Sequence, residues 1–214
     1  MKNKFNQWLF CCLIFIAAMI VVRFKFTGTV RYVFLVWNIF LAFIPYAFSV
    51  FFQHFLQKAK WKKIVLFFSW LLFFPNALYI VTDIIHLEDN RDVPVWFDAI
   101  LLFTSSFVGL ALAFASLMNV EHFLHHFYSE LKVKYMVGLL LFAGAFGVYL
   151  GRFQRWNSWD IVSNPFLLAV DIAGRFVNPF AHLYSWGIIA FLTTLYSICW
   201  YSLKTLADSK NEVA

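Results

Sequence analysis

Four polar residues recur at helical spacing where an apolar segment ends. They are Asn76, Tyr79, Asp83 and His86, at intervals of three, four and three residues. If an α-helix continues past Pro75, all four lie on one face, with Ile80 on the opposite face. An amide, a phenol, a carboxylate and an imidazole in such a row can bind a polar ligand or transfer protons. The alternative is that Pro75 and Asn76 end the helix and Asp83 caps the next turn.

A second polar stretch, LGRFQRWNSWDI at 150–161, follows a later apolar segment. Arginine forms bidentate contacts to carboxylate or phosphate, and tryptophan is typical of the headgroup level of a bilayer. The alternative is an interfacial belt whose arginines extend to water. The candidate ligand-binding residues in this stretch are Arg152, Arg155, Trp156, Asn157, Trp159 and Asp160.

Two further residues complete the candidate set. Asp98 follows Trp96 at the start of one apolar segment, and His182 begins the last one. Carboxylates and imidazoles are also metal ligands, so a divalent metal is possible although nothing in the sequence requires one. The metal candidates are Asp83, His86, Asp160 and His182.

The composition indicates that these residues belong to a membrane protein. The 214 residues are 63% hydrophobic and 13% charged, whereas soluble domains are about half apolar and a quarter charged. Six apolar segments approach the roughly 20 residues that a helix needs to cross a bilayer. The sequence therefore predicts an all-α, six-helix transmembrane domain over residues 1–207 and a short polar tail over 208–214. The predicted segments are 8–22, 30–56, 61–81, 95–118, 133–150 and 182–203.

Charge predicts the orientation of this bundle. Six crossings put both termini on one side, where every basic residue is a lysine, and the other side carries all the arginines and Lys25. The larger number of basic residues on the terminal side predicts cytoplasmic termini and a multi-pass protein of the inner cell membrane. The net charge of +6 is explained by this orientation and does not indicate a nucleic-acid partner. The expected partner is the lipid bilayer, with a lipid or an anionic small molecule as possible ligand.

Two features describe the packing and the loops. Gly109 and Ala113, four residues apart, predict a face for close helix contact. Between 161 and 181, Asn164 and Pro165 are typical of a helix start. Asp171 and Arg175 are placed to pair at i, i+4. We expect a short helix here, lying in the interface on the outer side.

The segments PNALYIVTDIIHL and GRFQRWNSWDI, in a six-span chain of this length, resemble a bacterial membrane family catalogued as domain of unknown function 1361. The resemblance runs from the second span to the sixth. The family pattern usually has PNAPY, and Leu78 replaces its second proline. The resemblance implies a bacterial inner-membrane protein and supplies no substrate or reaction.

Three functions agree with these patterns, and the sequence leaves open whether the chain is an enzyme. The first is an extracytoplasmic pocket, formed by the two polar stretches together, that binds or transports a polar or anionic solute, ion or lipid headgroup. The second is a membrane-embedded enzyme, possibly metal-dependent, acting on a lipid-linked or phosphate-bearing substrate. The third is a structural or assembly subunit whose ion pairs lock the bundle. Mixed acids and arginines favour the first, because binding needs no reaction chemistry.

Overall fold

A computed structural model describes residues 2–88 and 93–212. Val213 and Ala214, at the end of the predicted tail, lie outside this part. The elements in it are all helical, and six segments are long and apolar enough to cross a membrane. They agree with the six segments predicted from the sequence. These spans are Lys4–Thr27, Phe34–Phe55, Lys60–His86, Val95–His125, Glu130–Phe153 and Pro179–Ala207.

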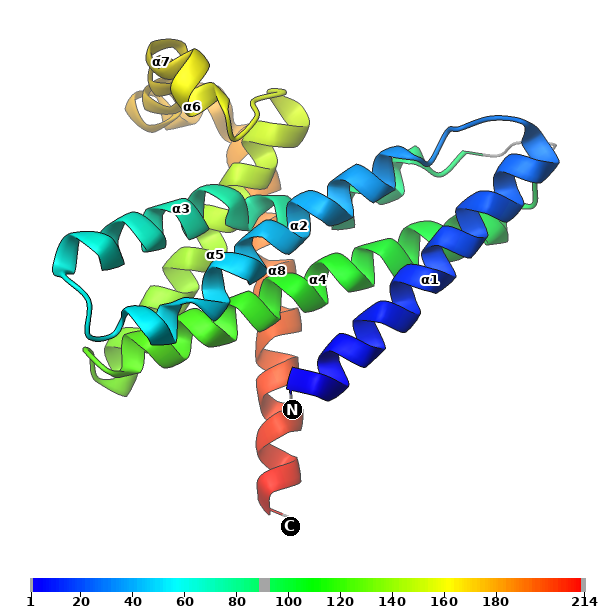
Figure 1. Cartoon of the computed structure of the whole chain (residues 1–214). Coiled ribbons are helices and arrows are strands. Elements are labelled where there is room, and N and C mark those ends of the chain that lie inside the picture. Colours follow the sequence, from blue (N-terminus) through cyan, green and yellow to red (C-terminus); the bar gives the residue numbers. More distant parts are fainter. Residues whose placement is uncertain (1, 89–92, 213–214) are drawn as a thin grey trace. The chain divides into compact units, whose positions relative to one another are not determined.

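The helices belong to two compact units, Met1–Asn119 and Val120–Ala214, whose boundary falls within α4. A single domain over residues 1–207 therefore stays a prediction. The last helix, α8, continues to Glu212, past the start of the predicted tail. The elements are α1 (Lys2–Thr27), α2 (Phe34–Val50), η1 (Phe52–Phe55), α3 (Lys60–Tyr79), η2 (Ile80–His86), α4 (Val95–His125), α5 (Glu130–Phe153), α6 (Asp160–Ser163), α7 (Pro165–Val177), η3 (Pro179–His182) and α8 (Leu183–Glu212) (Figure 1).

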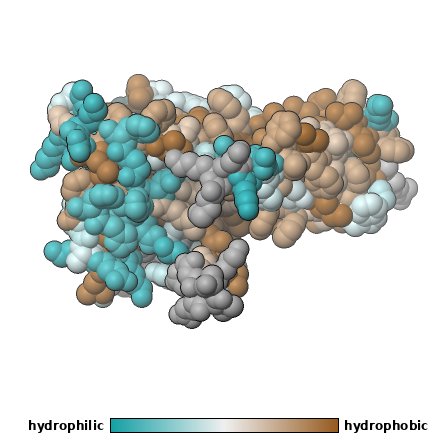
Figure 2. Space-filling view, turned by 60° about the horizontal axis from the view of Figure 1, so that its bottom comes forward, coloured by the Kyte–Doolittle hydropathy of each residue, from teal (hydrophilic) through white to brown (hydrophobic). Residues whose placement is uncertain are grey.

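The surface of the spans is apolar. Phe10 on α1, Phe103 on α4 and Phe191 on α8 are all well over half exposed. Figure 2 shows broad hydrophobic areas in brown beside areas where hydrophilic residues gather in teal. Exposed apolar surface on this scale is typical of helices that face lipid tails. The fold and its surface together indicate a multi-pass membrane protein.

In the first unit, α2 packs along α3, and α4 approaches the end of α3 closely. A Cβ atom added to Gly109 would lie 2.8 Å from the carbonyl oxygen of Ala77 and 3.1 Å from Cβ of Ile80. Nearby, the Trp70 indole N–H donates to Oγ of Ser116 on α4 at 3.3 Å. The contact expected at Gly109 is therefore confirmed, and only a residue without a side chain fits there.

The winding of the chain changes at Ile80. Helix α3 continues through Pro75 to Tyr79, and η2 then follows as a 3₁₀-helix. Because a 3₁₀-helix has three residues per turn, Ile80, Asp83 and His86 align. Ile80 and Asp83 are 0% and 1% exposed. The expectation that Ile80 lies opposite Asp83 was thus wrong, because residues three apart are only about 60° apart around an α-helix and align in a 3₁₀-helix.

Side chains satisfy the backbone carbonyls at this change of winding. The Thr82 hydroxyl donates to the carbonyl oxygen of Tyr79 at 2.6 Å. Ser106 on α4 donates to the carbonyl oxygen of Ile80 at 3.0 Å. Buried backbone groups need such partners, so α4 helps to hold η2 in its tighter winding.

In the second unit, α5 packs along α8, and α7 lies against α6 and η3. The short helix predicted after Asn164 is confirmed as α7, with Pro165 in its first turn. The core of this unit forms around Tyr149, Leu150 and Ile189, which are buried. Packed against them are Phe142, Phe146, Trp156, Leu168, Ile172, Trp186 and Ile188. Helix α7 contributes Leu168 and Ile172, so this core fixes its position on the unit.

Candidate functional site

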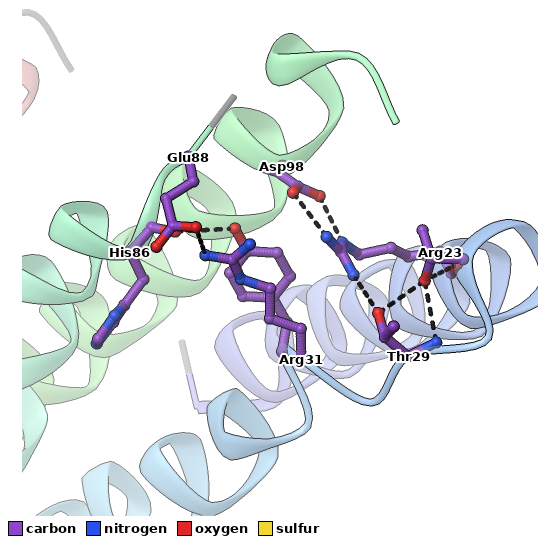
Figure 3. A network of polar contacts seen from close by, with 8 residues as sticks. Arg23, Thr29, Arg31, His86, Glu88 and Asp98 are labelled. Carbon is purple, nitrogen blue, oxygen red and sulfur yellow. Dashed lines mark hydrogen bonds and ion pairs between the residues drawn. The ribbon is translucent and has the colours of Figure 1, made fainter. Parts of the chain in front are cut away.

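A buried ion pair joins the end of α1 to the first turn of α4. The Arg23 Nε–H donates to Oδ1 of Asp98 at 2.8 Å, and Nη2–H donates to Oδ2 at 3.1 Å (Figure 3). Their side chains are 4% and 2% exposed. The Arg23 Nη1–H also donates to the Thr29 hydroxyl at 3.1 Å. Both oxygens of Asp98 are thus bound within the protein, which gives this candidate ligand-binding residue a structural role.

Tyr32 lies between two guanidinium groups beside this pair. Its ring centroid is 4.7 Å from Cζ of Arg23 and 5.7 Å from Cζ of Arg31, both within the range of cation–π attraction. Its hydroxyl donates to the carbonyl oxygen of His86 at 3.1 Å. Burial, followed by the nearby Asp98 carboxylate, raises the pKa of Tyr32 to about 12. Tyr32 therefore stays protonated near neutral pH and ties the start of α2 to the end of η2.

The end of η2 has a second, more exposed ion pair. Arg31 Nη2 lies 2.6 Å from Oε2 of Glu88, and the Glu88 side chain is 64% exposed. Figure 3 shows this pair beside His86, with Arg23 and Asp98 farther along the same polar network. An exposed pair of this kind contributes little to stability.

Asp83 is buried and accepts a hydrogen bond from the side-chain Nδ2–H of Asn38 on α2 at 2.8 Å. The His86 ring lies edge-on to Phe34, with centroids 5.2 Å apart. Asn76 and Tyr79 are half-buried on the last α-helical turn. Asp83 and His86 therefore both contact α2, and the spacing of the four polar residues did not predict this contact.

The second unit has a polar network around Tyr149. The Tyr149 and Ser185 hydroxyls share a hydrogen bond of 2.7 Å. The Gln154 side-chain Nε2–H donates to Tyr149 Oη at 2.9 Å. The Arg175 Nε–H, from α7, donates to the same oxygen at 3.3 Å. Tyr149 thus connects α5 and α8 to α7.

Asp171 and Arg175 form the predicted i, i+4 ion pair, with Arg175 Nη1 2.8 Å from Oδ1 of Asp171. The Trp156 indole N–H donates to Oδ2 of Asp171 at 2.7 Å. Burial acts to raise the pKa of Asp171, but the hydrogen bonds from Arg175 and Trp156 outweigh it, so the pKa lies below its ordinary value. Trp156, a candidate ligand-binding residue, is thereby attached to α7.

Asp160 closes the turn that leads into α6. Its Oδ2 accepts from the backbone N–H of Asn157 at 2.7 Å, and its Oδ1 accepts from the Ser163 hydroxyl at 3.0 Å. The backbone hydrogen bond from Asn157 and then the bond from Ser163 lower the pKa of Asp160. This carboxylate is therefore engaged by its own turn.

Arg155 differs from its neighbours in conformation and contacts. Its φ is 61°, the only positive φ among the non-glycine residues in the described part of the chain. The side chain is exposed, and no described residue forms a hydrogen bond or ion pair with it. Arg152, one turn earlier, is half-buried, and Trp159 is exposed. Arg155 thus presents an accessible guanidinium at the end of α5.

The metal candidates do not come together as a set within either unit. Asp83 and His86 belong to the first unit, and Asp160 and His182 belong to the second. Among the residues that the structure describes, no three histidine, cysteine or acidic side chains form a metal-type group. A single pocket built from both polar stretches stays a prediction.

The profile of a family described as protein of unknown function (DUF1361) matches residues 37–199. The chain belongs to the DUF1361 family. The match runs from α2 into α8 and includes both polar stretches, as expected from the resemblance. No curated protein and no solved structure matches the chain. Arg23 precedes the DUF1361 match, so the Arg23–Asp98 pair links the matched region to α1.

Sequence reasoning missed several residues of these networks in the DUF1361 chain. From the sequence, Arg23 is only one of the arginines predicted to lie on the side opposite the termini. The signal that would have indicated this pair is a basic residue at the end of one apolar segment together with an acidic residue at the start of another. The others lie in apolar or loop sequence with no distinctive spacing. They are Tyr32, Asn38, Tyr149, Gln154 and Ser185.

Proposed function

We propose that this DUF1361 protein recognises an anionic group at the surface of the inner membrane, where α5 ends. The termini are cytoplasmic in this proposal, so the connection between α5 and α8 lies on the outer side. Helix α7 then lies in the outer interface. The single observation that carries the proposal is the exposed Arg155 guanidinium, which no described residue neutralises.

The backbone at Arg155 supports a role beyond folding. A left-handed conformation costs an ordinary residue about 1–2 kcal/mol, and glycine is the usual residue where a helix ends this way. Arginine at this position therefore makes the fold less stable than glycine would. Strain of this kind is typical of residues whose side chains are aimed for function. The Arg155 side chain is exposed in this conformation.

The surroundings of Arg155 favour an anion over a cation. The nearby carboxylates of Asp160 and Asp171 are already engaged, the first by its own turn and the second by Arg175 and Trp156. Arg152 adds a second positive charge in the last turn of α5. Guanidinium groups bind carboxylate and phosphate oxygens through paired hydrogen bonds. The guanidinium of Arg155 is thus available to a phosphate or carboxylate.

Variants of Arg155 test the proposal. The purified protein in nanodiscs would be titrated with inorganic phosphate and sn-glycerol 3-phosphate by calorimetry, and its bound phosphatidylglycerol measured by native mass spectrometry. We expect at least one of these anions to bind, and Arg155→Gln to weaken that binding about tenfold or more, the loss of roughly 1.4 kcal/mol. Arg155→Lys keeps the charge and loses the bidentate geometry, so an intermediate effect is expected. Equal binding by wild type and Arg155→Gln would contradict the proposal.

A further inference from the structure

We infer that the anion at Arg155 is the headgroup of a phospholipid whose acyl chain lies along the outward face of α7 and η3. This inference rests on the proposed function and names the class of its ligand. Four observations carry it: the inward charges of α7, its apolar outward face, its place between two spans, and its bond to the Arg155 turn.

The charged residues of α7 face the protein. Arg175 is 4% exposed although it is an arginine in a surface helix. Its guanidinium contacts Tyr149 and Asp171, and Asp171 also accepts the hydrogen bond from Trp156. On a helix that faces water, the polar side points outward. Helix α7 has the reverse arrangement.

The opposite side of this segment is apolar and uncovered by the chain. Four large hydrophobic residues on it are between 53% and 84% exposed. Such a surface is typical of a site that contacts a membrane or a partner. These residues are Phe166, Val170, Val177 and Phe180.

The position of α7 in the chain identifies lipid as the occupant of this surface. The segment 154–178 connects two spans, Glu130–Phe153 and Pro179–Ala207. It is therefore held close to the level at which these spans leave the bilayer, where amphipathic helices lie with their apolar face among the upper acyl carbons. Trp159, in the same connection, is exposed and of the type enriched at this level.

The headgroup contact and the apolar face belong to one site. Trp156 follows Arg155 directly, and its indole is bonded to Asp171 of α7 at 2.7 Å. The Trp156 ring also packs on the core of the second unit. This attachment fixes the Arg155 turn to α7. A molecule with an anionic end and an apolar chain matches the combination, whereas a free anion uses only the arginine.

The experiment compares retention of phosphatidylglycerol and phosphatidylcholine by native mass spectrometry, on protein taken from nanodiscs that contain both lipids. We expect the wild type to retain phosphatidylglycerol about tenfold over phosphatidylcholine. The double variant Val177→Ser/Phe180→Ser should lower this retention about tenfold, and Arg155→Gln should remove the preference for phosphatidylglycerol. The matched control, Phe191→Ser, removes an exposed apolar residue from the middle of α8 and should leave the preference unchanged.

Soluble sn-glycerol 3-phosphate separates this inference from the proposed function. Two results together overturn the lipid inference: glycerol phosphate displaces phosphatidylglycerol at comparable concentration, and Arg155→Gln still weakens the binding of both molecules. In that result, the recognition of an anion by Arg155 stands. It is also overturned if Val177→Ser/Phe180→Ser changes the oligomeric state by light scattering, because a second copy then covers the surface. If Arg155→Gln changes the binding of neither molecule, the proposed function itself fails.

Discussion

Both carboxylate oxygens of Asp98 accept hydrogen bonds from the guanidinium of Arg23, which lies 75 residues earlier in the chain. The pair is buried between the end of α1 and the start of α4. Replacing a buried ion pair by apolar residues is often neutral, but removing one partner leaves an uncompensated charge. The pair therefore sets which helix ends meet, and either residue alone is harmful to the fold.

The first prediction concerns this pair. Arg23→Gln and Asp98→Asn should each destabilise the protein by about 3–5 kcal/mol, measured by chemical unfolding in detergent followed by circular dichroism. The double variant should lose less than the sum of the two single losses, because it leaves no unpaired charge. Strictly additive losses would show that the two side chains do not interact.

The second prediction concerns the close approach at Gly109. Gly109→Ala puts a methyl group 2.8 Å from the Ala77 carbonyl oxygen, so α4 must move away from α3 at a cost of about 1–3 kcal/mol. Gly138→Ala, on α5, is the control because its added methyl group meets nothing within 4 Å. The control should be neutral or stabilise by up to about 1 kcal/mol through helix propensity. A thermal shift of the same sign and size in both variants would contradict this account.

The third prediction separates stability from binding at Arg155. Arg155→Gly removes the left-handed strain and should raise the free energy of unfolding by about 1 kcal/mol. The same substitution removes the guanidinium, so anion binding should fall as for Arg155→Gln. Parallel denaturation and calorimetry on one preparation would check both effects. A variant that loses stability and binding together would indicate that Arg155 serves the fold.

The fourth prediction concerns pH and the attachment of α7. The pKa of Asp171 lies below its ordinary value of 3.8 in the folded protein. Its contribution to stability is therefore complete above about pH 3.8 and is lost as pH falls through the lower, folded pKa. We expect no change in the attachment between pH 7 and about pH 5 and detachment only in stronger acid. The attachment is measured by tryptophan fluorescence, as the difference at each pH between the wild type and the Trp156→Phe variant.

Asp171→Asn is the control for this titration. It keeps the shape of the side chain and removes the charge that Arg175 binds. The variant should show a weakened attachment already at pH 7 and little further change down to pH 4. A wild-type transition near pH 6 would contradict this account, because the pKa of Asp171 lies below 3.8.

The sequence predicted those parts of the fold that depend on local pattern. The lengths of the apolar segments predicted the six spans, and the i, i+4 spacing predicted the Asp171–Arg175 ion pair. The contact at Gly109 also followed from small-residue spacing. Each of these features is decided within a few helical turns, where periodicity and side-chain size act directly.

Features that depend on distant segments could not be predicted. The partner of Asp98 lies 75 residues away, and nothing in the sequence around Asp98 indicates which cation it meets. The change of winding at Ile80 depends partly on Ser106 of α4, which binds the Ile80 carbonyl oxygen. The left-handed backbone at Arg155 is unexpected for an arginine, because glycine is the usual residue at that position.

The tighter winding of η2 also sets how far the chain reaches. A 3₁₀-helix rises about 2.0 Å per residue against 1.5 Å for an α-helix, so these residues extend roughly 3.5 Å farther than α-helical turns would. Rewinding them as an α-helix would shorten that reach and rotate Asp83 away from Asn38. The pitch of η2 thus decides both how deeply the Asp83 carboxylate is buried and which neighbouring residue it contacts.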